Sequence, residues 1–266
     1  MVTDPITSLT NSRIKTVIKL RKRRQRDATG TFIVEGYREL FRLLEAGRST
    51  RTLFISPELF IGSNELDLVA RCRKTGSEII EVAAAPFRKA SYRDRPEGLL
   101  AIADQFDTSL DQIPLRADPL VLVVESIEKP GNLGTMLRTA EAAGLSGMIV
   151  ADPMTDPFNP NVVRASLGTL FAVPLAITDT ASAIAHLRSA GVSIVATTPD
   201  ASLAHHQADL TGPTAIVIGS EQYGLSTDWL EGADTKVMIP MPGSVDSLNA
   251  AMAAGIVVFE AIRQRS

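Results

Sequence analysis

The sequence predicts an α/β fold in two parts, a small α/β domain followed by a larger domain built on a parallel sheet. From Thr31 onward, short apolar runs alternate with amphipathic stretches, a pattern typical of successive strands and helices. The apolar runs of the second half are more continuous, as in parallel strands that helices cover on both faces. Residues 106–118 are acidic, carry a proline and show no sustained period. We therefore expect a domain at 1–105, a linker at 106–118 and a domain at 119–266.

The first domain opens with a basic arm. Eight basic residues and no acidic one lie between positions 13 and 26, although the net charge of the chain is −3. Such a run suits the phosphate backbone of a nucleic acid. Our candidates for substrate contacts in it are Arg21, Arg23 and Arg24. The plain alternative is a solvated helix face, because an apolar stripe that includes Ile14 and Val17 would seat the helix with its cations outward.

The rest of the first domain is expected to contain strands and helices in the order βαβαβαβ. The strands are TFIVEG (31–36), TLFIS (52–56), EIIEV (78–82) and GLLAIAD (98–104), and the helices are Tyr37–Ala46, Glu65–Lys74 and Pro86–Tyr92. This alternation predicts a small sheet with helices packed on it.

The second domain repeats the alternation with longer apolar strands. The strands are PLVLVVES (119–126), GMIVAD (147–152), FAVPLAI (171–177), VSIVATT (192–198), TAIVIGSE (214–221) and KVMIPM (236–241), with helices at 133–143, 160–168, 180–190 and about 247 to 263. In the last helix, Leu248, Met252 and Phe259 roughly follow helical spacing.

The first of three polar clusters, NLGTMLR at 132–138, follows the strand at 119–126. Asn132 is a favourable N-cap residue, and an apolar stripe that begins at Leu133 would then face inward. Gly134 and Arg138 fall on the other face, where a glycine one turn before the arginine leaves room for a ribose phosphate. The alternative for Arg138 is an exposed helix arginine paired with Glu141 at i+3.

The second cluster, IGSEQYGLS at 218–226, ends another apolar strand. Ligands of open α/β sheets gather outside the carboxyl ends of the strands. Gly219 would let a cofactor approach the backbone, and Glu221 would accept a cationic partner such as Arg138. Ser226 is expected to cap the next helix rather than to act in catalysis.

The third cluster lies within IPMPGSVDSLNAAMAAG at 239–255, where a loop turns into the last helix. Ser247 suits a helix cap, a role that is compatible with a substrate contact. Asn249 has less structural reason to stand in a first helical turn. The small residues at 250–255 permit close packing against other backbone, including that of a second subunit.

Several other classes of protein are disfavoured. Neither half carries GxGxxG after its first strand, and the chain has no Walker A sequence, which weakens dehydrogenase and kinase interpretations. The three histidines lie outside the clusters without zinc-site spacing, so we assign no metal. Cys72 is the single cysteine, and no apolar run approaches the ~20 residues of a membrane span. We expect a cytoplasmic enzyme without a membrane partner.

The three clusters, in this order and spacing, resemble those of the SpoU (TrmH) family of RNA 2′-O-ribose methyltransferases in the SPOUT superfamily. The resemblance covers residues 119–263, and the first part resembles the small substrate-binding domain often fused ahead of it. It implies that the C-terminal domain holds a deep trefoil knot in which S-adenosyl-L-methionine binds in a bent form. It also implies a homodimer with active sites built between the subunits.

The resemblance also implies roles for particular residues. The catalytic candidates that it implies are Asn132, Arg138, Glu221, Ser247 and Asn249. The cofactor would meet the loops through Thr197, Gly219, Ile239, Met241 and Leu248. Asn161 and Arg164 resemble a further family segment, in which an arginine lies near the target phosphate or ribose. The sequence departs from the family at residues 125–129, where relatives often carry an aspartate.

Family proposals make the arginine at position 138 the general base, but a guanidinium is normally always protonated in proteins. Our hypothesis is that Arg138 binds the adjacent phosphate and stabilises alkoxide charge, that Glu221 orients Arg138, and that Ser247 or Asn249 fixes the ribose. The expected substrate is RNA and not DNA. We expect 23S ribosomal RNA methylated at guanosine or uridine. A tRNA substrate and a non-catalytic RNA-binding protein remain alternatives.

Overall fold

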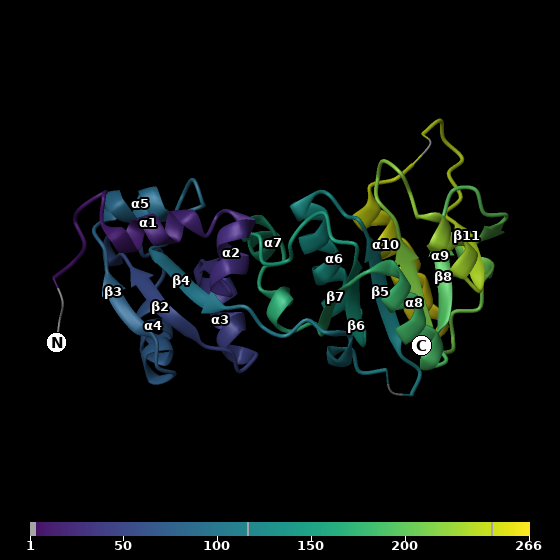
Figure 1. The fold of residues 1–266 in the computed structure, drawn as a ribbon, viewed down its shortest axis with the longest axis horizontal. Helices are drawn as coiled ribbons and strands as arrows, with labels where there is room; N and C mark the ends of the chain where they lie inside the picture. The colour runs from purple at the N-terminus through teal and green to yellow at the C-terminus, as the bar shows by residue number, and fades with distance from the viewer. Residues whose placement is uncertain (1–3, 116, 246) are drawn as a thin grey trace. The chain divides into compact units, whose positions relative to one another are not determined.

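The structure, a computed structural model, describes residues 4–115, 117–245 and 247–266. Arg116 of the predicted linker and Asp246 of the third cluster lie outside the described residues, as do residues 1–3. The chain forms two compact units (Figure 1). The first runs up to Phe106 and includes Asp156–Ala172, and the second comprises Asp107–Thr155 and Val173–Ser266.

The first unit contains a four-stranded mixed sheet with strand order β1-β4-β2-β3 (Figure 1). Its strands are β1 (Thr31–Glu35), β2 (Thr50–Ile55), β3 (Glu78–Glu81) and β4 (Leu99–Asp104). β2 and β3 are parallel, whereas β4 runs antiparallel to both β1 and β2. The four strands expected from the apolar runs are therefore present, and β4 lies in the middle of the sheet.

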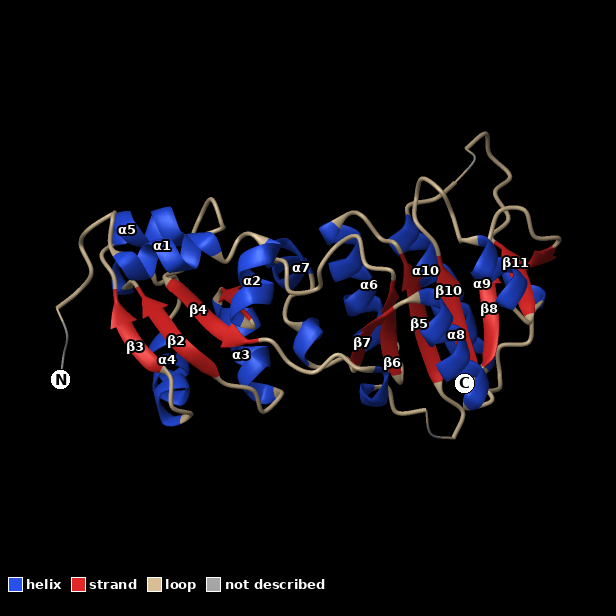
Figure 2. Ribbon diagram, in the orientation of Figure 1, coloured by secondary structure: helices blue, strands red, loops and turns tan. Residues whose placement is uncertain are grey.

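Helices cover both faces of this sheet (Figure 2). α1 (Ser12–Lys19) and α5 (Ala84–Ala90) share one core with the strands, to which they contribute Ile14, Val17 and Phe87. α3 (Tyr37–Glu45) and α4 (Glu65–Lys74) pack together on the other face. α2 (Arg23–Thr29) and α7 (Pro160–Ala165) contact β1. The unit also contains short 3-10 turns at Pro57–Leu59 and Thr169–Phe171. The basic arm thus forms two helices, α1 and α2, rather than one.

Residues 156–172 pack within the first unit, although the linear prediction counted them in the domain at 119–266. The ring of Phe158 lies with its centroid 5.0 Å from that of Phe32 and 5.0 Å from that of Phe106. Arg26 Nη2 lies 2.6 Å from Asp156 Oδ2 in an ion pair that is almost fully buried. Hydrophobic periodicity indicates elements but not their packing partners, so this return of the chain was not visible in the sequence.

The second unit is built on a seven-stranded sheet with strand order β7-β6-β5-β10-β8-β11-β9. Its strands are β5 (Leu120–Glu125), β6 (Gly147–Ala151), β7 (Leu175–Thr178), β8 (Ser193–Thr197), β9 (Leu203–Ala204), β10 (Thr214–Ile218) and β11 (Thr235–Met238). Every pairing within this sheet is parallel, and each residue of β5, β6 and β10 is buried. The parallel sheet predicted from continuous apolar runs is confirmed.

Helices cover both faces of the second sheet. α8 (Thr180–Ser189) and α9 (Thr227–Gly232) share a core with β5, β8 and β10 that includes Trp229. α6 (Pro130–Ala142) and α10 (Ala250–Gln264) pack against each other, and α10 also contacts β10. The remaining helical turns are Leu110–Gln112 and His205–Gln207. No helix within the described residues, including α10 with its 15 residues, combines the length and apolar character that crossing a bilayer requires.

Part of the segment predicted as a linker packs onto the second unit. Ile113 is 4% exposed within the core of that unit, and the Thr108 carbonyl accepts a hydrogen bond from the Ile177 amide at 2.8 Å. The composition of residues 106–118 indicated polarity but did not reveal this apolar anchor.

The register of the central strands places the three clusters at one edge of the second sheet. Ile218, the last residue of β10, pairs with Val124 of β5 and with Thr197 of β8. The carboxyl ends of β5, β10 and β8 therefore lie level, and the segments that follow them leave from the same edge. The trefoil knot implied by the family resemblance stays a prediction.

Candidate active site

The first cluster forms the opening turns of α6. The helix begins at Pro130, with Lys129 at the N-cap position. Proline is favoured at the first helical position because its missing N–H would be unsatisfied there in any case. The prediction of Asn132 as N-cap is therefore wrong, and Asn132 instead lies in the first turn. Gly134 is buried, so the prediction that it lies on the exposed face with Arg138 is also wrong.

Three side chains donate to the carboxylate of Glu221 in the second cluster: Lys129 just ahead of the first cluster, Asn132 within it, and Asn249 of the third. We call these four residues the Glu221 hub. Asn132 Nδ2 donates to Glu221 Oε1 at 2.7 Å, and Asn249 Nδ2 donates to the same oxygen at 2.6 Å. Lys129 Nζ donates to the other oxygen, Oε2. Asn249 Nδ2 also donates to Asn132 Oδ1 at 3.0 Å. The hub thus ties α6, the loop after β10 and the start of α10 together.

The electrostatics of the hub keep its central carboxylate charged. The hydrogen bond from the Lys129 ammonium lowers the pKa of Glu221, and the amide donor of Asn132 adds to this effect. An ionised glutamate accepts hydrogen bonds but donates none, so its surroundings must present donors. Both asparagine amides are consequently oriented with their NH₂ groups toward Glu221.

Asn249 carries two structural tasks with one side chain. It is the N-cap of α10, and its Oδ1 accepts from the amides of Ala251 at 3.0 Å and Met252 at 3.3 Å. Its Nδ2 group meanwhile joins the Glu221 hub. The structure therefore corrects two expectations, because Asn249 rather than Ser247 caps the helix. Ser247 lies in the preceding loop and lines the cavity described below.

Arg138 is exposed on α6 and takes no part in the hub. The predicted ion pair between Arg138 and Glu221 is not present, because Lys129 and the two asparagines take up the carboxylate. Within the described residues the Arg138 guanidinium has no ion pair or hydrogen bond to another side chain. This leaves its five N–H donors available to a group from outside the chain.

The loop of the second cluster closes on itself through two glycines. Ser220 and Gly224 exchange backbone hydrogen bonds, each with an N–O distance of 3.1 Å. A Cβ at Gly219 would lie 2.2 Å from the carbonyl carbon of Gly224, so no larger residue fits there. Gly224 has φ +67°, a left-handed conformation that favours glycine. We predicted that Gly219 lets a cofactor approach the backbone; the structure shows that Gly219 is also required for this turn to close.

Glu125, at the end of β5, holds the loop of the second cluster in place through a hydrogen bond to its last residue, Ser226. Glu125 is buried, with 5% of its surface exposed. Oε2 accepts from the Ser226 amide at 2.8 Å, and Oε1 accepts from the Thr180 hydroxyl at 3.3 Å. Sequence reasoning singled out residues 125–129 as a departure without assigning a role. The available signal was a glutamate at the end of an otherwise apolar strand, since a buried carboxylate requires donors nearby.

A cavity of about 380 Å³ lies beside the hub, over the carboxyl ends of β8 and β10. All five residues predicted to meet the cofactor line it: Thr197, Gly219, Ile239, Met241 and Leu248. Glu221 and Ser247 also line this cavity. Its volume falls in the range of small-molecule sites, which is ~300–1,000 Å³.

One observation within the cavity indicates a missing polar partner. The Thr197 hydroxyl oxygen is buried and has no hydrogen-bond partner among the described residues. Buried polar groups are normally satisfied, and an orphan that lines a cavity is most simply completed by a ligand. The mixture of apolar side chains, loop backbone and an unpaired hydroxyl fits a nucleoside-containing cofactor that combines an apolar base face with polar ribose and amino-acid groups.

The four predicted substrate-binding arginines all belong to the first unit. They differ in whether their guanidinium groups already form hydrogen bonds or ion pairs within the chain. Arg21 Nη2 donates to the carbonyls of Lys89, Ala90 and Ser91 at 2.7–3.1 Å, so this side chain holds the end of α5. Arg23 lies 3.7 Å from Asp27 in an exposed i,i+4 ion pair. Arg24 and Arg164 are exposed. Of the four, Arg24 and Arg164 have guanidinium groups without a partner in the described part of the chain.

Comparison with known proteins places this site in a family. Residues 119–259 match the SpoU rRNA methylase family, and residues 11–101 match the MRM3-like substrate binding domain. The chain belongs to the SpoU rRNA methylase family. The family prediction is confirmed, and with it the prediction of a methyltransferase fold of the SPOUT type.

Relatives of this SpoU-family chain match most of its length. It is 34% identical to the 23S rRNA (uridine(2479)-2′-O)-methyltransferase of Streptomyces viridochromogenes, over 92% of this chain and 87% of that protein. It is 28% identical to the 23S rRNA (guanosine(2553)-2′-O)-methyltransferase RlmP of Bacillus subtilis, over 96% and 97% of the two chains. Among solved structures, an AdoMet-bound rRNA methyltransferase from Sinorhizobium meliloti matches with a TM-score of 0.90, 34% identity and coverage of 98% and 97%.

Proposed function

We propose that this SpoU-family chain transfers a methyl group from S-adenosyl-L-methionine to a ribose 2′-hydroxyl of 23S ribosomal RNA. The single observation that carries the proposal is the Glu221 hub, which stands at the rim of a cavity lined by all five predicted cofactor residues. Support for the substrate comes from the two relatives described above, both of which are named for 23S rRNA. We place the enzyme in the cytoplasm with its RNA.

The cavity residues fit the cofactor as follows. S-adenosyl-L-methionine supplies an electrophilic methyl group on a sulfonium, whose C–S bond breaks with its electrons remaining on sulfur. Thr197 offers its unpaired hydroxyl, and Ile239, Met241 and Leu248 offer apolar contacts. Gly219 presents backbone without a side chain.

The hub and Arg138 prepare the nucleophile. A ribose 2′-hydroxyl must release its proton, here to solvent, as its oxygen bonds to the methyl carbon, and alkoxide charge develops on that oxygen. The free guanidinium of Arg138 binds the adjacent phosphate and stabilises this charge. Glu221 holds Asn132 and Asn249 rather than Arg138, which revises the orientation role expected from the sequence. Ser247 lies on the same cavity and contacts the ribose.

We also propose that the active enzyme is a homodimer that uses the face of α10. Met252 and Phe259 are 61% and 50% exposed, and they stand seven residues apart on one face of this helix. Exposed apolar side chains that align on a helix are typical of an interaction surface. Sedimentation equilibrium should report a dimer for the native chain and a monomer for Phe259→Asp.

The decisive experiment measures methyl transfer from labelled S-adenosyl-L-methionine to protein-free 23S rRNA, 16S rRNA and tRNA, followed by nucleoside mass spectrometry. We expect a 2′-O-methyl nucleoside in 23S rRNA, its loss in Arg138→Ala, and unchanged activity in Arg73→Ala, a matched exposed arginine on α4. Label in tRNA would replace the substrate class. Cofactor binding without label in any RNA would contradict methyl transfer to free RNA.

The role of Arg138 has its own test. An Arg138→Lys variant that keeps activity and the native pH–rate profile supports charge stabilisation, since a lysine would titrate differently from an arginine acting as base. A profile displaced toward the titration of lysine would instead indicate that position 138 removes the proton.

A further inference from the structure

The first unit contains a second, polar cavity that shares no residue with the candidate active site. It is open, has a volume of about 710 Å³, and is lined by residues of α3, the loop after α5, and α7 with the turn that follows it. The residues that matter are Arg93, Glu39 and Glu97 on its floor and Arg38, Arg95 and Arg164 on its rim. All of them belong to the same compact unit.

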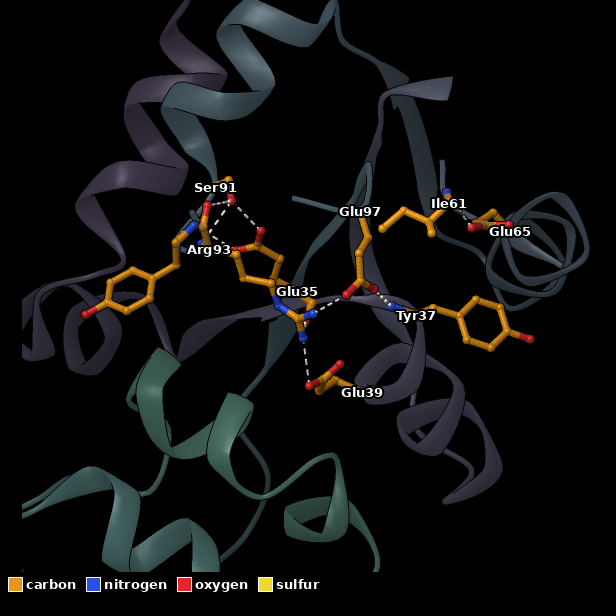
Figure 3. A network of polar contacts seen from close by, with 9 residues as sticks. Glu35, Tyr37, Glu39, Ile61, Glu65, Ser91, Arg93 and Glu97 are labelled. Carbon is orange, nitrogen blue, oxygen red and sulfur yellow. Dashed lines mark hydrogen bonds and ion pairs between the residues drawn. The ribbon is translucent and has the colours of Figure 1, made fainter. Parts of the chain in front are cut away.

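The floor is a fixed ion network (Figure 3). Arg93 Nη2 donates to Glu39 Oε1 at 2.7 Å and to the Glu35 carbonyl at 2.9 Å, while Arg93 Nη1 donates to Glu97 Oε1 at 2.5 Å. Glu39 is 2% exposed, and burial raises its pKa. A buried carboxylate needs a cation or several hydrogen-bond donors. Moving Arg93 away would leave the buried carboxylate of Glu39 without its cation, and the free-energy cost of that state keeps Arg93 in place.

Backbone geometry fixes this floor further. Gly36 has φ +106°, and a Cβ there would lie 2.4 Å from Arg93 Nη2 and 2.6 Å from Glu39 Oε2. Only glycine lets the guanidinium and the carboxylate approach this closely. The Glu35 carboxylate accepts from the Ser91 hydroxyl at 2.5 Å and from the Tyr92 amide at 2.7 Å, which pins the start of the 91–98 loop. The loop that carries Arg95 is therefore anchored at its base.

The rim differs from the floor because its arginines are free. Arg38, Arg95 and Arg164 are exposed, and none of their guanidinium groups has an ion pair or hydrogen bond in the described ranges. Three other arginines of this unit are ion-paired, namely Arg13 with Glu78, Arg51 with Asp104, and Arg71 with Glu45. Unpaired arginines elsewhere in the described part of the unit, such as Arg24 and Arg73, do not line this cavity. The three free cations come from separate segments and meet at one cavity, opposed on the rim by Asp94 alone among the described residues.

We propose that this cavity is a binding site for the phosphate backbone of the RNA substrate, with Arg38, Arg95 and Arg164 as the contacting residues. The inference rests on the proposed function, because it takes the RNA that is methylated as the ligand. Guanidinium groups match phosphate oxygens in a bidentate manner. Tyr37 also lines the cavity, and its ring stacks with that of Phe41, with the ring centroids 6.0 Å apart. A folded RNA element presents several phosphates to arginines on three separate segments, whereas free phosphate presents a single anion.

The test measures binding of protein-free 23S rRNA across a series of salt concentrations. Arg38→Gln, Arg95→Gln and Arg164→Gln are measured as single variants and as a triple variant. Arg51→Gln and Arg71→Gln, which replace ion-paired arginines, are the controls. Each lost phosphate contact should reduce the slope of log K against log salt by about 0.9, which is about 8-fold in Kd at ~0.1 M salt. The triple variant should lose about 2.7 from the slope, and the controls should lose nothing. Inorganic phosphate at matched ionic strength should not displace the RNA.

Three outcomes distinguish a failure of the proposed function from a failure of the cavity proposal. A native chain that neither binds nor methylates 23S rRNA overturns the proposed function. A native chain that methylates this RNA while the triple variant keeps its affinity and slope overturns the cavity proposal alone. Displacement by inorganic phosphate would overturn the RNA element in favour of a free anion. Thermal melting of each variant shows that it is folded, and the single variants decide the matter if the triple one is not.

Discussion

Asn249 offers a way to separate the stability of α10 from the chemistry of the hub. Its Oδ1 caps the helix through the amides of Ala251 and Met252, while its Nδ2 reaches Glu221 and Asn132. Replacement by serine keeps an oxygen at the cap but is too short to reach the hub. Replacement by alanine removes both. The pair Asn249→Ser and Asn249→Ala therefore tests two functions of one side chain.

The expected magnitudes follow from these contacts. Losing a favourable N-cap costs about 1 kcal/mol, whereas exchange among good capping residues costs a few tenths. The hub lies in partly exposed surroundings, so its hydrogen bonds add little to stability. For activity the hub matters more than the cap, because a misplaced orienting group lowers the rate by about 10²-fold. We expect Asn249→Ala to lower the free energy of unfolding by about 1 kcal/mol, Asn249→Ser to lower it much less, and both to lose kcat alike.

Urea unfolding and steady-state methyl transfer measure the two quantities. Asn11→Ser is the matched control, because Asn11 caps α1 through the Arg13 amide at 2.8 Å in the other unit. It should change neither kcat nor KM. Native kcat in Asn249→Ser would refute the hub as part of the active site. Equal losses of stability in the serine and alanine variants would refute the capping argument.

Three further variants test other parts of the structure. Thr197→Val should weaken S-adenosyl-L-methionine binding about fivefold in calorimetry, because one hydrogen bond of ~1 kcal/mol is lost. The melting temperature should not fall, because the hydroxyl has no partner among the residues that the structure describes. Unchanged affinity would remove Thr197 from the site. Lys129→Met should raise the pKa of Glu221 toward its ordinary value, so the acid limb of the pH–rate profile should move to higher pH, and an unmoved limb would contradict the role of an ionised Glu221. Arg26→Met should cost ~3–5 kcal/mol in urea unfolding because it leaves Asp156 buried without its cation, and a loss below 1 kcal/mol would show that the pair is not buried in solution.

The sequence predicted most of the residues that meet at the candidate site but not how they pair with one another. Three clusters at strand ends predicted one edge of a parallel sheet, because carboxyl ends of parallel strands meet there. The helix starts were less accessible. Pro130 carried the signal for the true start of α6, but Asn132 was the more conspicuous capping residue. Ser247 and Asn249 were both good caps by residue type, and only backbone geometry separates them.

The charged residues show most clearly which contacts the sequence could not predict. Lys129 forms the ion pair with Glu221 that we expected of Arg138. Which of the two side chains reaches Glu221 depends on the rotation of α6 about its axis and on the course of the loop that carries Glu221. Arg26 belonged to a run that suggested a solvated cationic face, yet its side chain is 1% exposed. Its partner Asp156 is 130 residues away in the sequence. No local pattern reveals a buried pair at that separation.

The return of residues 156–172 to the first unit has a consequence for synthesis of the chain. Translation completes residues 4–106 long before Asp156 emerges, so the nascent first unit lacks α7 and the counter-ion of Arg26. It must wait, incompletely packed, while β5, α6 and β6 of the second unit leave the ribosome. A fragment that stops at residue 105 would lack α7 and Asp156, so the first unit is completed only after the first part of the second unit has been synthesised.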